Sequence, residues 1–381
     1  MKIALNGQKL VTQEPAGPEV YALNTIRSLA SIDSVNTYTV YFDRPPAESF
    51  WQELSAGNPN FSYRVLPGGL SWTHVSLARE LFRDKPDLYF GTNHTLPLLK
   101  PGKTVYISMI HGLEYRVNQQ LRKWSFKYAI HPLIIWWVLK TSSLVIVPSL
   151  SVSEALKILP WPFLKSLQIR TIPEGTHPRF FKRRQEEVEQ IRKKYGLGDF
   201  RYLIFVSTLQ PRKNIPGMVQ GFSLAVKDRP DLRETRLVIC GKHGWKNEMS
   251  LKAPETYGVA QQVLFLGRIP DEDLPSLYTG ADHFINLSLE EGFGLPLLEA
   301  MACETPTLVS DIPAFRELGR DLPIYVEPTN PLSIKEGIIK ALTSDRDEKK
   351  IKAAKELANR YTWQETASQL LSIFNSLIEH V

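Results

Sequence analysis

Short apolar segments alternate with helix-like segments along the whole chain. The apolar segments are apolar nearly throughout rather than at every second position, which is typical of strands buried on both faces of a parallel sheet. Strands are expected at Met1–Asn6, Tyr38–Phe42, Tyr89–Phe90, Val105–Met109, Leu144–Pro148, Tyr202–Val206, Leu237–Cys240, Val263–Leu266, His283–Leu287 and Pro306–Val309. The stretches between them have apolar residues at helical spacing, so the pattern predicts an α/β protein with two Rossmann-like halves.

Charged residues mark the junction between the two halves. Phe180–Gly198 is rich in Lys, Arg and Glu, which predicts a solvated linker followed by a surface helix. Near the end of the chain, Trp363–Ile378 again has apolar residues at helical spacing. A chain of 381 residues is long enough for two domains of ordinary size.

The overall composition excludes several classes of protein. With 43% hydrophobic and 23% charged residues, the chain has the balance of a soluble globular protein. Its longest apolar run, near Ile130–Val138, is about half as long as a membrane-spanning helix. The formal net charge of +6 suits an anionic substrate or an anionic membrane surface. No basic stripe with interleaved aromatic residues is present, which argues against nucleic acid.

Cysteine usage and the first residues indicate the compartment. Cys240 and Cys303 are far apart in sequence and have apolar neighbours, so neither a metal site nor a disulfide framework is expected. The opening MKIALNG predicts a strand and lacks the charged, apolar and small-residue regions of a signal peptide. We therefore expect a reducing, cytoplasmic location.

Residues 290–304, with the sequence EEGFGLPLLEAMACE, carry the most specific chemical signal. Glu291 and Glu299 are separated by seven residues, and Pro296 suits the first turn of a helix predicted over Leu297–Cys303. The free N–H groups at the start of that helix can hold a phosphate or a sugar hydroxyl, and the glycines let the backbone approach it. Two carboxylates at different depths can bind two diols, one on a sugar and one on a ribose. An isolated pair of acids at this spacing would as readily be incidental, but the intervening G-F-G-L-P favours a ligand site.

This segment resembles the E-x7-E signature of glycosyltransferase family 4, a retaining group with two facing Rossmann-like domains known as the GT-B fold. Other segments are similar to further parts of that family: ISMIHG, SSLVIVPSLSVSEAL, TIPEGTHPRFF, STLQPRKN and YTWQETASQLL. The resemblance extends over nearly the whole chain. It implies an α/β protein of the GT-B fold, with parallel sheets and an interdomain cleft.

The resemblance also assigns tasks to parts of the chain. It implies an acceptor domain at residues 1–175, completed by the C-terminal helix 363–381, and a nucleotide-sugar donor domain at residues 176–362. The implied enzyme is a hexosyltransferase of the mannose or glucose type, acting in polysaccharide biosynthesis. Its donor would be a UDP- or GDP-linked sugar, and its acceptor a glycan, a lipid-linked molecule or a small molecule. It would need no other cofactor and no metal.

Arg212 and Lys213 lie between a predicted strand and a helical pattern that begins near Ile215. An Arg offers a fork of donors and a Lys a point charge, so adjacent cations at such a turn suit a pyrophosphate. We expect both side chains to be unpaired. The resemblance implies that they neutralise the leaving diphosphate, although Ser207–Thr208 stand where many family members have a Gly–Arg pair.

In the first half, His111 follows a predicted strand, and Gly17 precedes a helical pattern. Taken alone, such a His is more often structural, and a single glycine fits an ordinary helix start. The resemblance implies that His111 lies beside the donor sugar and that the Gly17 loop approaches the donor phosphate. Many family members have an Asp after the His, where this chain has Gly112, and two glycines in the loop.

The resemblance thus yields two sets of site residues. The implied catalytic residues are His111, Arg212, Lys213 and Glu291. The implied donor-binding residues are Gly17, Arg212, Lys213, Gly292, Phe293, Gly294, Leu295 and Glu299.

Two acidic triplets, Asp271–Asp273 and Asp345–Asp347, have the spacing of a metal-binding motif. The first precedes LPSLY and is typical of a helix start. The second lies in a charged run. Because neither directly follows a predicted strand, we expect no metal site.

Arg116–Lys140 mixes cations with aromatic residues. This pattern fits a segment on the inner face of a membrane, and it also fits a buried helix with a solvated face. We expect burial for Ile134–Val138 and leave both possibilities open for the rest.

Two other functions remain as alternatives: a nucleotide-sugar epimerase of the same fold, and a catalytically inactive binding or regulatory subunit. The intact Glu291, Glu299, Arg212 and Lys213 argue against the inactive subunit. A dinucleotide-dependent oxidoreductase is disfavoured because no G-x-G-x-x-G follows the first strand.

Overall fold

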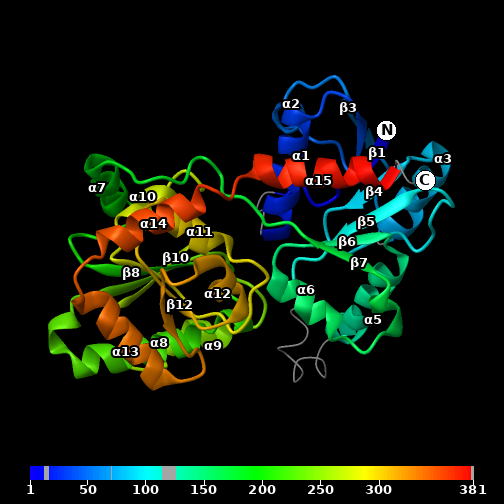
Figure 1. The fold of residues 1–381 in the computed structure, drawn as a ribbon. Coiled ribbons are helices and arrows are strands. Elements are labelled where there is room, and N and C mark those ends of the chain that lie inside the picture. The colour runs from blue at the N-terminus through cyan, green and yellow to red at the C-terminus, as the bar shows by residue number, and fades with distance from the viewer. Residues whose placement is uncertain (13–16, 70, 114–125, 379–381) are drawn as a thin grey trace. The chain divides into compact units, whose positions relative to one another are not determined.

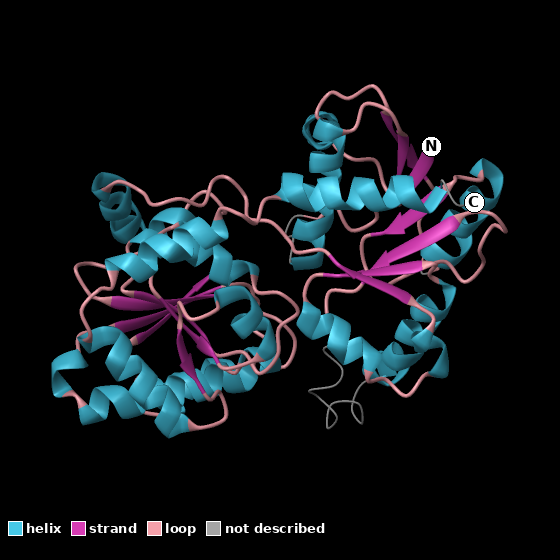
Figure 2. Ribbon diagram, viewed as in Figure 1, coloured by secondary structure: helices cyan, strands magenta, loops and turns pink. Residues whose placement is uncertain are grey.

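The computed structural model describes residues 1–12, 17–69, 71–113 and 126–378 and divides the chain into two compact units (Figure 1). Unit 1 contains Met1–Gly175 and Thr362–Val381, and unit 2 contains Thr176–Tyr361. In each unit, helices cover both faces of a parallel sheet (Figure 2). The last helix, α15 (Trp363–Ile378), belongs to unit 1, where it packs against α1 (Gly17–Ile32).

Unit 1 is built on a seven-stranded sheet with the order β3-β2-β1-β4-β5-β6-β7. Its strands are β1 (Lys2–Asn6), β2 (Thr37–Phe42), β3 (Phe61–Val65), β4 (Leu88–Gly91), β5 (Val105–Met109), β6 (Leu144–Val147) and β7 (Gln168–Thr171). Its other helices are α2 (Glu48–Ser55), η1 (Thr73–Leu77), α3 (Ala78–Asp84), α5 (Phe126–Thr141), α6 (Leu150–Lys157) and η2 (Pro162–Lys165). The strand order reverses at β1, which lies between β2 and β4.

Unit 2 is built on a six-stranded sheet with the order β10-β9-β8-β11-β12-β13. Its strands are β8 (Tyr202–Val206), β9 (Arg236–Cys240), β10 (Val263–Gly267), β11 (His283–Asn286), β12 (Thr307–Ser310) and β13 (Ile324–Val326). Its helices are α7 (Gln185–Lys194), η3 (Pro211–Lys213), α8 (Ile215–Asp228), η4 (Pro230–Leu232), α9 (Glu248–Thr256), α10 (Leu274–Thr279), α11 (Leu295–Ala302), α12 (Pro313–Gly319), α13 (Pro331–Thr343) and α14 (Glu348–Ala358). The strand order reverses between β8 and β11, and open α/β sheets bind ligands beyond the carboxyl ends of such strands.

Alternation along β8 places apolar side chains on both faces of the unit 2 sheet. Leu203 and Phe205 pack in a buried cluster with residues of α8 and α13. Tyr202 and Ile204 pack on the other face with residues of α10, α11 and α14. A strand covered on both faces has no polar face, which is why it appears as a continuous apolar segment in the sequence.

The strands expected from the apolar segments are all present, each within one residue of its predicted ends. Three strands were missed, β3, β7 and β13, and each lies at the edge of its sheet. Edge strands are less covered: β3 and β7 contain exposed positions, and β13 has three residues. β3 and β7 therefore lack the continuous apolar pattern that marks the central strands, and β13 is too short for a pattern to show.

Candidate active site

The segment between the two spaced glutamates forms a turn and a helix start beyond the carboxyl end of β11. Gly294, with φ 108°, precedes α11 in a conformation that favours glycine. A Cβ at Gly294 would lie 2.8 Å from Cε1 of Phe315, so packing excludes a side chain there as well. The helix runs from Leu295 to Ala302, beginning two residues before the predicted start. Glu291 therefore lies in the turn and Glu299 within the helix.

Glu291 meets both predicted cations in a buried ion cluster. Nη1 of Arg212 lies 2.9 Å from Oε2 of Glu291, and Nζ of Lys213 donates a hydrogen bond to Oε1. The cations come from η3, which follows β8, and the glutamate from the turn after β11. The expectation that Arg212 and Lys213 are unpaired is therefore wrong, because the adjacent strands of the reversal bring an acid to both.

The charges in this cluster control the ionisation of Glu291. Burial by itself opposes ionisation, but the nearby Lys213 and Arg212 charges and their hydrogen bonds lower the pKa of Glu291 to about 2. The Glu291 and Lys213 side chains are 8% and 6% exposed, so water screens their attraction weakly. With Glu291 ionised, the three groups carry one net positive charge.

A polar network at the end of β11 supports Glu291 from the protein interior. Oγ of Ser288 lies 2.9 Å from Oε1 of Glu291 and 2.6 Å from Oδ1 of Asn286. The backbone carbonyl of Ser288 accepts a hydrogen bond from Oγ of Ser310 at 2.7 Å. Asn286, Ser288 and Ser310 are fully buried. Sequence reasoning missed these three residues, although for Asn286 and Ser288 their place within the otherwise apolar HFINLSL was a usable signal.

Glu299 has a different environment. Its Oε2 accepts a hydrogen bond from the Tyr278 hydroxyl at 3.0 Å. Burial raises the pKa of Glu299 to about 7, the hydrogen bond from Tyr278 opposes that rise, and the charge of Asp271 adds to it. The two acids therefore differ, because burial holds the pKa of Glu299 well above that of Glu291.

The two candidate residues of unit 1 also lie at strand ends and helix starts. His111 follows β5, and its ring stands edge-on to that of Tyr21 with 4.9 Å between centroids. Nδ1 of His111 lies 3.2 Å from Oε1 of Glu174, and Nε2 lies 3.0 Å from the carbonyl oxygen of Thr92. Gly17 is the first residue of α1 and is exposed, and a Cβ built there meets no atom within 4 Å.

Comparison with known proteins identifies the class of enzyme. The model of the family described as glycosyl transferases group 1 matches residues 187–358, which include the cation turn and both glutamates. The chain is also 29% identical over 328 residues to the O-antigen chain mannosyltransferase B of Escherichia coli, covering 83% of this chain and 80% of that protein. This chain is a glycosyltransferase, and its residues 187–358 match the group 1 family.

Solved structures agree on the fold of this glycosyltransferase. The sucrose-phosphate synthase of Thermosynechococcus elongatus superposes with a TM-score of 0.78 at 18% identity, covering 100% of both chains. Anabaena HepE, solved in complex with UDP-glucose, superposes with a TM-score of 0.73 at 16% identity, covering 99% of this chain and 100% of that one. The fold is the GT-B fold, with a parallel α/β sheet in each unit.

The acidic triplets of the glycosyltransferase serve local structure. Asp273 precedes α10 as expected, but its side chain does not cap that helix. Oδ2 of Asp273 instead accepts hydrogen bonds from Nζ of Lys194 at 2.6 Å and from the Tyr195 hydroxyl at 2.5 Å. Asp347 caps α14 through the backbone N–H of Lys350. Within the described ranges, no three His, Cys, Asp or Glu side chains form a group that could hold a metal ion.

The aromatic and cationic segment of the glycosyltransferase is only partly described. Residues 116–125 lie outside the described residues, as do the side chains of residues 126–131. Within the expected buried stretch, Ile135 and Val138 are buried and Trp136 and Trp137 are partly buried. Leu133, just before this stretch, is exposed. In the described part of the chain, no helix combines the length and apolar character that crossing a membrane requires.

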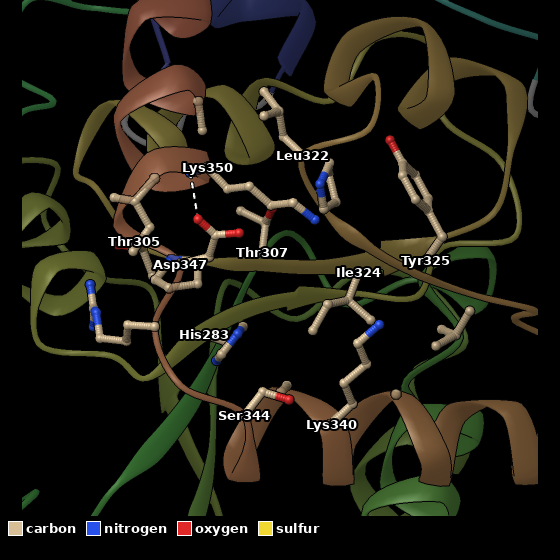
Figure 3. A pocket seen from close by; sticks show the side chains of 18 of the residues that line it. His283, Thr305, Thr307, Leu322, Ile324, Tyr325, Lys340, Ser344, Asp347 and Lys350 are labelled. Atoms are coloured by element: carbon tan, nitrogen blue, oxygen red, sulfur yellow. Dashed lines mark hydrogen bonds between the residues drawn. The ribbon is translucent and has the colours of Figure 1, made fainter.

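A separate hollow of about 490 Å³ lies at the amino ends of β11 and β12 and along β13 (Figure 3). Its lining includes His283, Thr305 and Ile324, at or just before strand starts, and Lys340, Asp347 and Lys350 from α13 and the start of α14. Volume alone would favour this hollow as a ligand site. However, Glu291 and its cations follow the carboxyl ends of the strands, so the hollow contains none of the site residues.

Proposed function

We propose that this glycosyltransferase is a retaining, metal-independent hexosyltransferase that transfers mannose from a nucleoside-diphosphate mannose to a glycan acceptor during polysaccharide synthesis. The observation that carries the proposal is the Arg212–Lys213–Glu291 cluster beyond the reversal of strand order in unit 2. The choice of mannose and of a polysaccharide is supported by the E. coli relative, which is named as an O-antigen chain mannosyltransferase. UDP-glucose is the competing donor, because HepE was solved with it.

The cation cluster suits the diphosphate of the donor. Arg212 and Lys213 bring two cationic side chains to one turn, and such a pair attracts a diphosphate. When the bond between the anomeric carbon and the diphosphate oxygen breaks, negative charge develops on the leaving group. Fixed cations next to that group stabilise the transition state more than the bound donor. This charge compensation takes the place of a metal ion in the proposal.

Transfer with retention then needs no strong protein base. The acceptor hydroxyl attacks the anomeric carbon from the face that the diphosphate leaves, and the new C–O bond forms on that face. The acceptor proton moves to the departing phosphate oxygen. We propose that Glu291, held by Ser288 and the two cations, accepts a hydrogen bond from a sugar hydroxyl, and that the backbone at Gly292–Leu295 donates to the donor.

Glu299 is proposed to bind the donor ribose. Its carboxylate is positioned by Tyr278 through one oxygen, Oε2. A ribose diol can donate two hydrogen bonds to a carboxylate, and these favour the ionised form. Donor binding would therefore shift the pKa of Glu299 downward from about 7.

Unit 1 is proposed to supply His111 and the Gly17 loop to the donor.

Unit 1 is also proposed to offer a surface for a membrane. Leu98, Leu99 and Leu133 are exposed. Nε1 of Trp137 donates to the carbonyl of Pro97 at 3.4 Å, which places the loop with the two leucines beside α5. Apolar side chains near lysines such as Lys140 suit peripheral contact with an anionic membrane. The protein should sediment with phosphatidylglycerol vesicles and should stay in the supernatant with phosphatidylcholine vesicles.

A donor screen tests the proposed function. The purified enzyme is incubated with GDP-mannose, UDP-glucose or UDP-galactose, with and without a mannose-terminated oligosaccharide. Mannosylation of the oligosaccharide supports the proposal. Interconversion of the donor sugar without acceptor would show that the protein is an epimerase instead. Nucleotide binding without any product would show that it is an inactive subunit.

A further inference from the structure

The contacts of the His111 ring constrain its chemistry. Nε2 lies 3.0 Å from the carbonyl oxygen of Thr92, which can only accept, so Nε2 carries a hydrogen. Nδ1 lies 3.2 Å from Oε1 of Glu174, a second acceptor when ionised. A stable contact therefore needs a proton between Nδ1 and the carboxylate, held by either group. With both ring nitrogens engaged by the protein, the ring has no nitrogen to offer as a base in the transfer.

Glu174 is itself held firmly in unit 1. It follows β7, is 6% exposed and precedes Gly175, the last residue of unit 1 on that stretch of chain. A Cβ at Gly175 would lie 2.2 Å from the backbone nitrogen of Trp363, so the chain here packs directly on the start of α15. The Tyr21 ring lies edge-on to both His111 and Trp363. These contacts leave the Glu174 carboxylate little freedom to turn away from His111.

We infer that Glu174 is a positioning residue for sugar transfer, because it holds the His111 ring and thereby fixes the peptide that follows β5 against the donor sugar. The inference rests on the proposed function, in which His111 lies beside the sugar of the donor. Glu174 itself touches neither donor nor acceptor in this account. Its loss should weaken the binding of the sugar part of the donor while leaving the binding of the nucleotide part unchanged.

Calorimetry with two ligands separates a positioning role from a structural one. GDP-mannose and GDP are titrated into wild type, Glu174→Gln and Glu174→Ala. Glu174→Ala should weaken GDP-mannose binding on the order of tenfold, by analogy with the loss when the hydrogen-bond partner of a metal-binding histidine is removed. GDP binding should stay within about twofold. Glu174→Gln, which can still hydrogen-bond the ring, should recover part of the loss.

The control removes another ion-paired carboxylate of unit 1. Glu80 lies 2.7 Å from Nη1 of Arg64, away from the His111 contacts. Glu80→Gln should bind both ligands as the wild type does. The inference would be overturned if Glu174→Ala lowered the melting temperature but changed the affinities for GDP and GDP-mannose equally, or changed neither affinity.

Nitrogen NMR tests the pair without any substrate. In histidine labelled with ¹⁵N, the His111 signals are assigned by their loss in His111→Asn. Nδ1 of His111 should show a hydrogen-bonded proton in the wild type and lose it in Glu174→Ala. Unchanged His111 signals would overturn the pairing. A third outcome is that the Nδ1 proton is present in the wild type and lost in Glu174→Ala while the wild type binds GDP-mannose no differently from GDP. In that case the proposed donor site fails, but the Glu174–His111 pair stands.

Discussion

Lys213 and Glu291 form a buried ion pair in unit 2 although they are 78 positions apart in the sequence. Arg212 binds the second oxygen of the same carboxylate. The residues proposed to act on the diphosphate are therefore also part of the folded core of unit 2. Losing one member takes an ionic partner from the others, so stability and turnover have to be measured separately.

Lys213→Met should lower both turnover and stability. We expect activity to fall at least about 100-fold, as when a group that stabilises developing charge is removed. Stability should fall by about 3 kcal/mol, because Glu291 stays buried with one partner fewer. Urea unfolding and initial rates measure the two effects.

A double variant separates them. Lys213→Met/Glu291→Gln should regain no activity, and its loss of stability should differ from the sum of the two single losses, because the two side chains are paired. Recovery of activity in the double variant would show that Lys213 acts only by balancing Glu291.

Acid should destabilise the protein partly through Glu291. Its pKa is about 2 in the folded state, below the ordinary value of 4.5 expected in the unfolded chain. The resulting stability is present above pH 4.5 and is lost as the pH falls from there toward 2. Glu291→Gln should therefore show a smaller loss of stability between pH 5 and pH 3 than the wild type. Parallel curves for the two proteins would contradict the low pKa.

Glu299 should give donor binding a pH dependence near neutrality. Its pKa of about 7 is raised by burial, so the carboxyl stabilises the unliganded fold below the ordinary value of 4.5 and loses that contribution as the pH rises through 7. Ribose hydroxyls favour the ionised form, so affinity for GDP-mannose should rise between pH 6 and pH 8. Glu299→Gln should bind more weakly at pH 8, with a flat profile. Equal profiles for variant and wild type in calorimetry would remove Glu299 from the ribose site.

Gly17→Val should reduce activity without reducing stability. A side chain at Gly17 meets no atom within 4 Å in unit 1, so the melting temperature should not change. If the loop approaches the donor phosphate, the added side chain should lower kcat/KM on the order of tenfold. Gly102, which also has open space around it, provides the matched control. Wild-type kcat/KM in Gly17→Val would exclude the loop from the donor site.

The central strands could be predicted from their apolar pattern, and the main site residues could be predicted from their spacing in the sequence. Central strands were found because both faces are covered, and edge strands such as β7 were missed because they have exposed positions. Glu291, Glu299, Arg212 and Lys213 were found from local context. Their pairing was not, because it depends on β8 and β11 being neighbours in the sheet.

Glu174 illustrates the same limit. Nothing within a few residues of it indicates a histidine partner, and the contact with His111 joins positions 63 apart. His111 and Glu174 follow the carboxyl ends of β5 and β7, and these ends lie near each other only because β5, β6 and β7 are consecutive parallel strands in the sheet. Sequence spacing alone cannot give such a relationship unless the strand order is already known.

Retaining mannosyl transfer without a metal can be tested in a single NMR time course. The enzyme is incubated with GDP-mannose, whose mannose is α-linked, and a mannose-terminated acceptor in the presence of EDTA. The first product formed should carry a new α-linked mannose, at the rate seen without EDTA. A β-linked first product, or a reaction that stops in EDTA and resumes with a divalent cation, would contradict it.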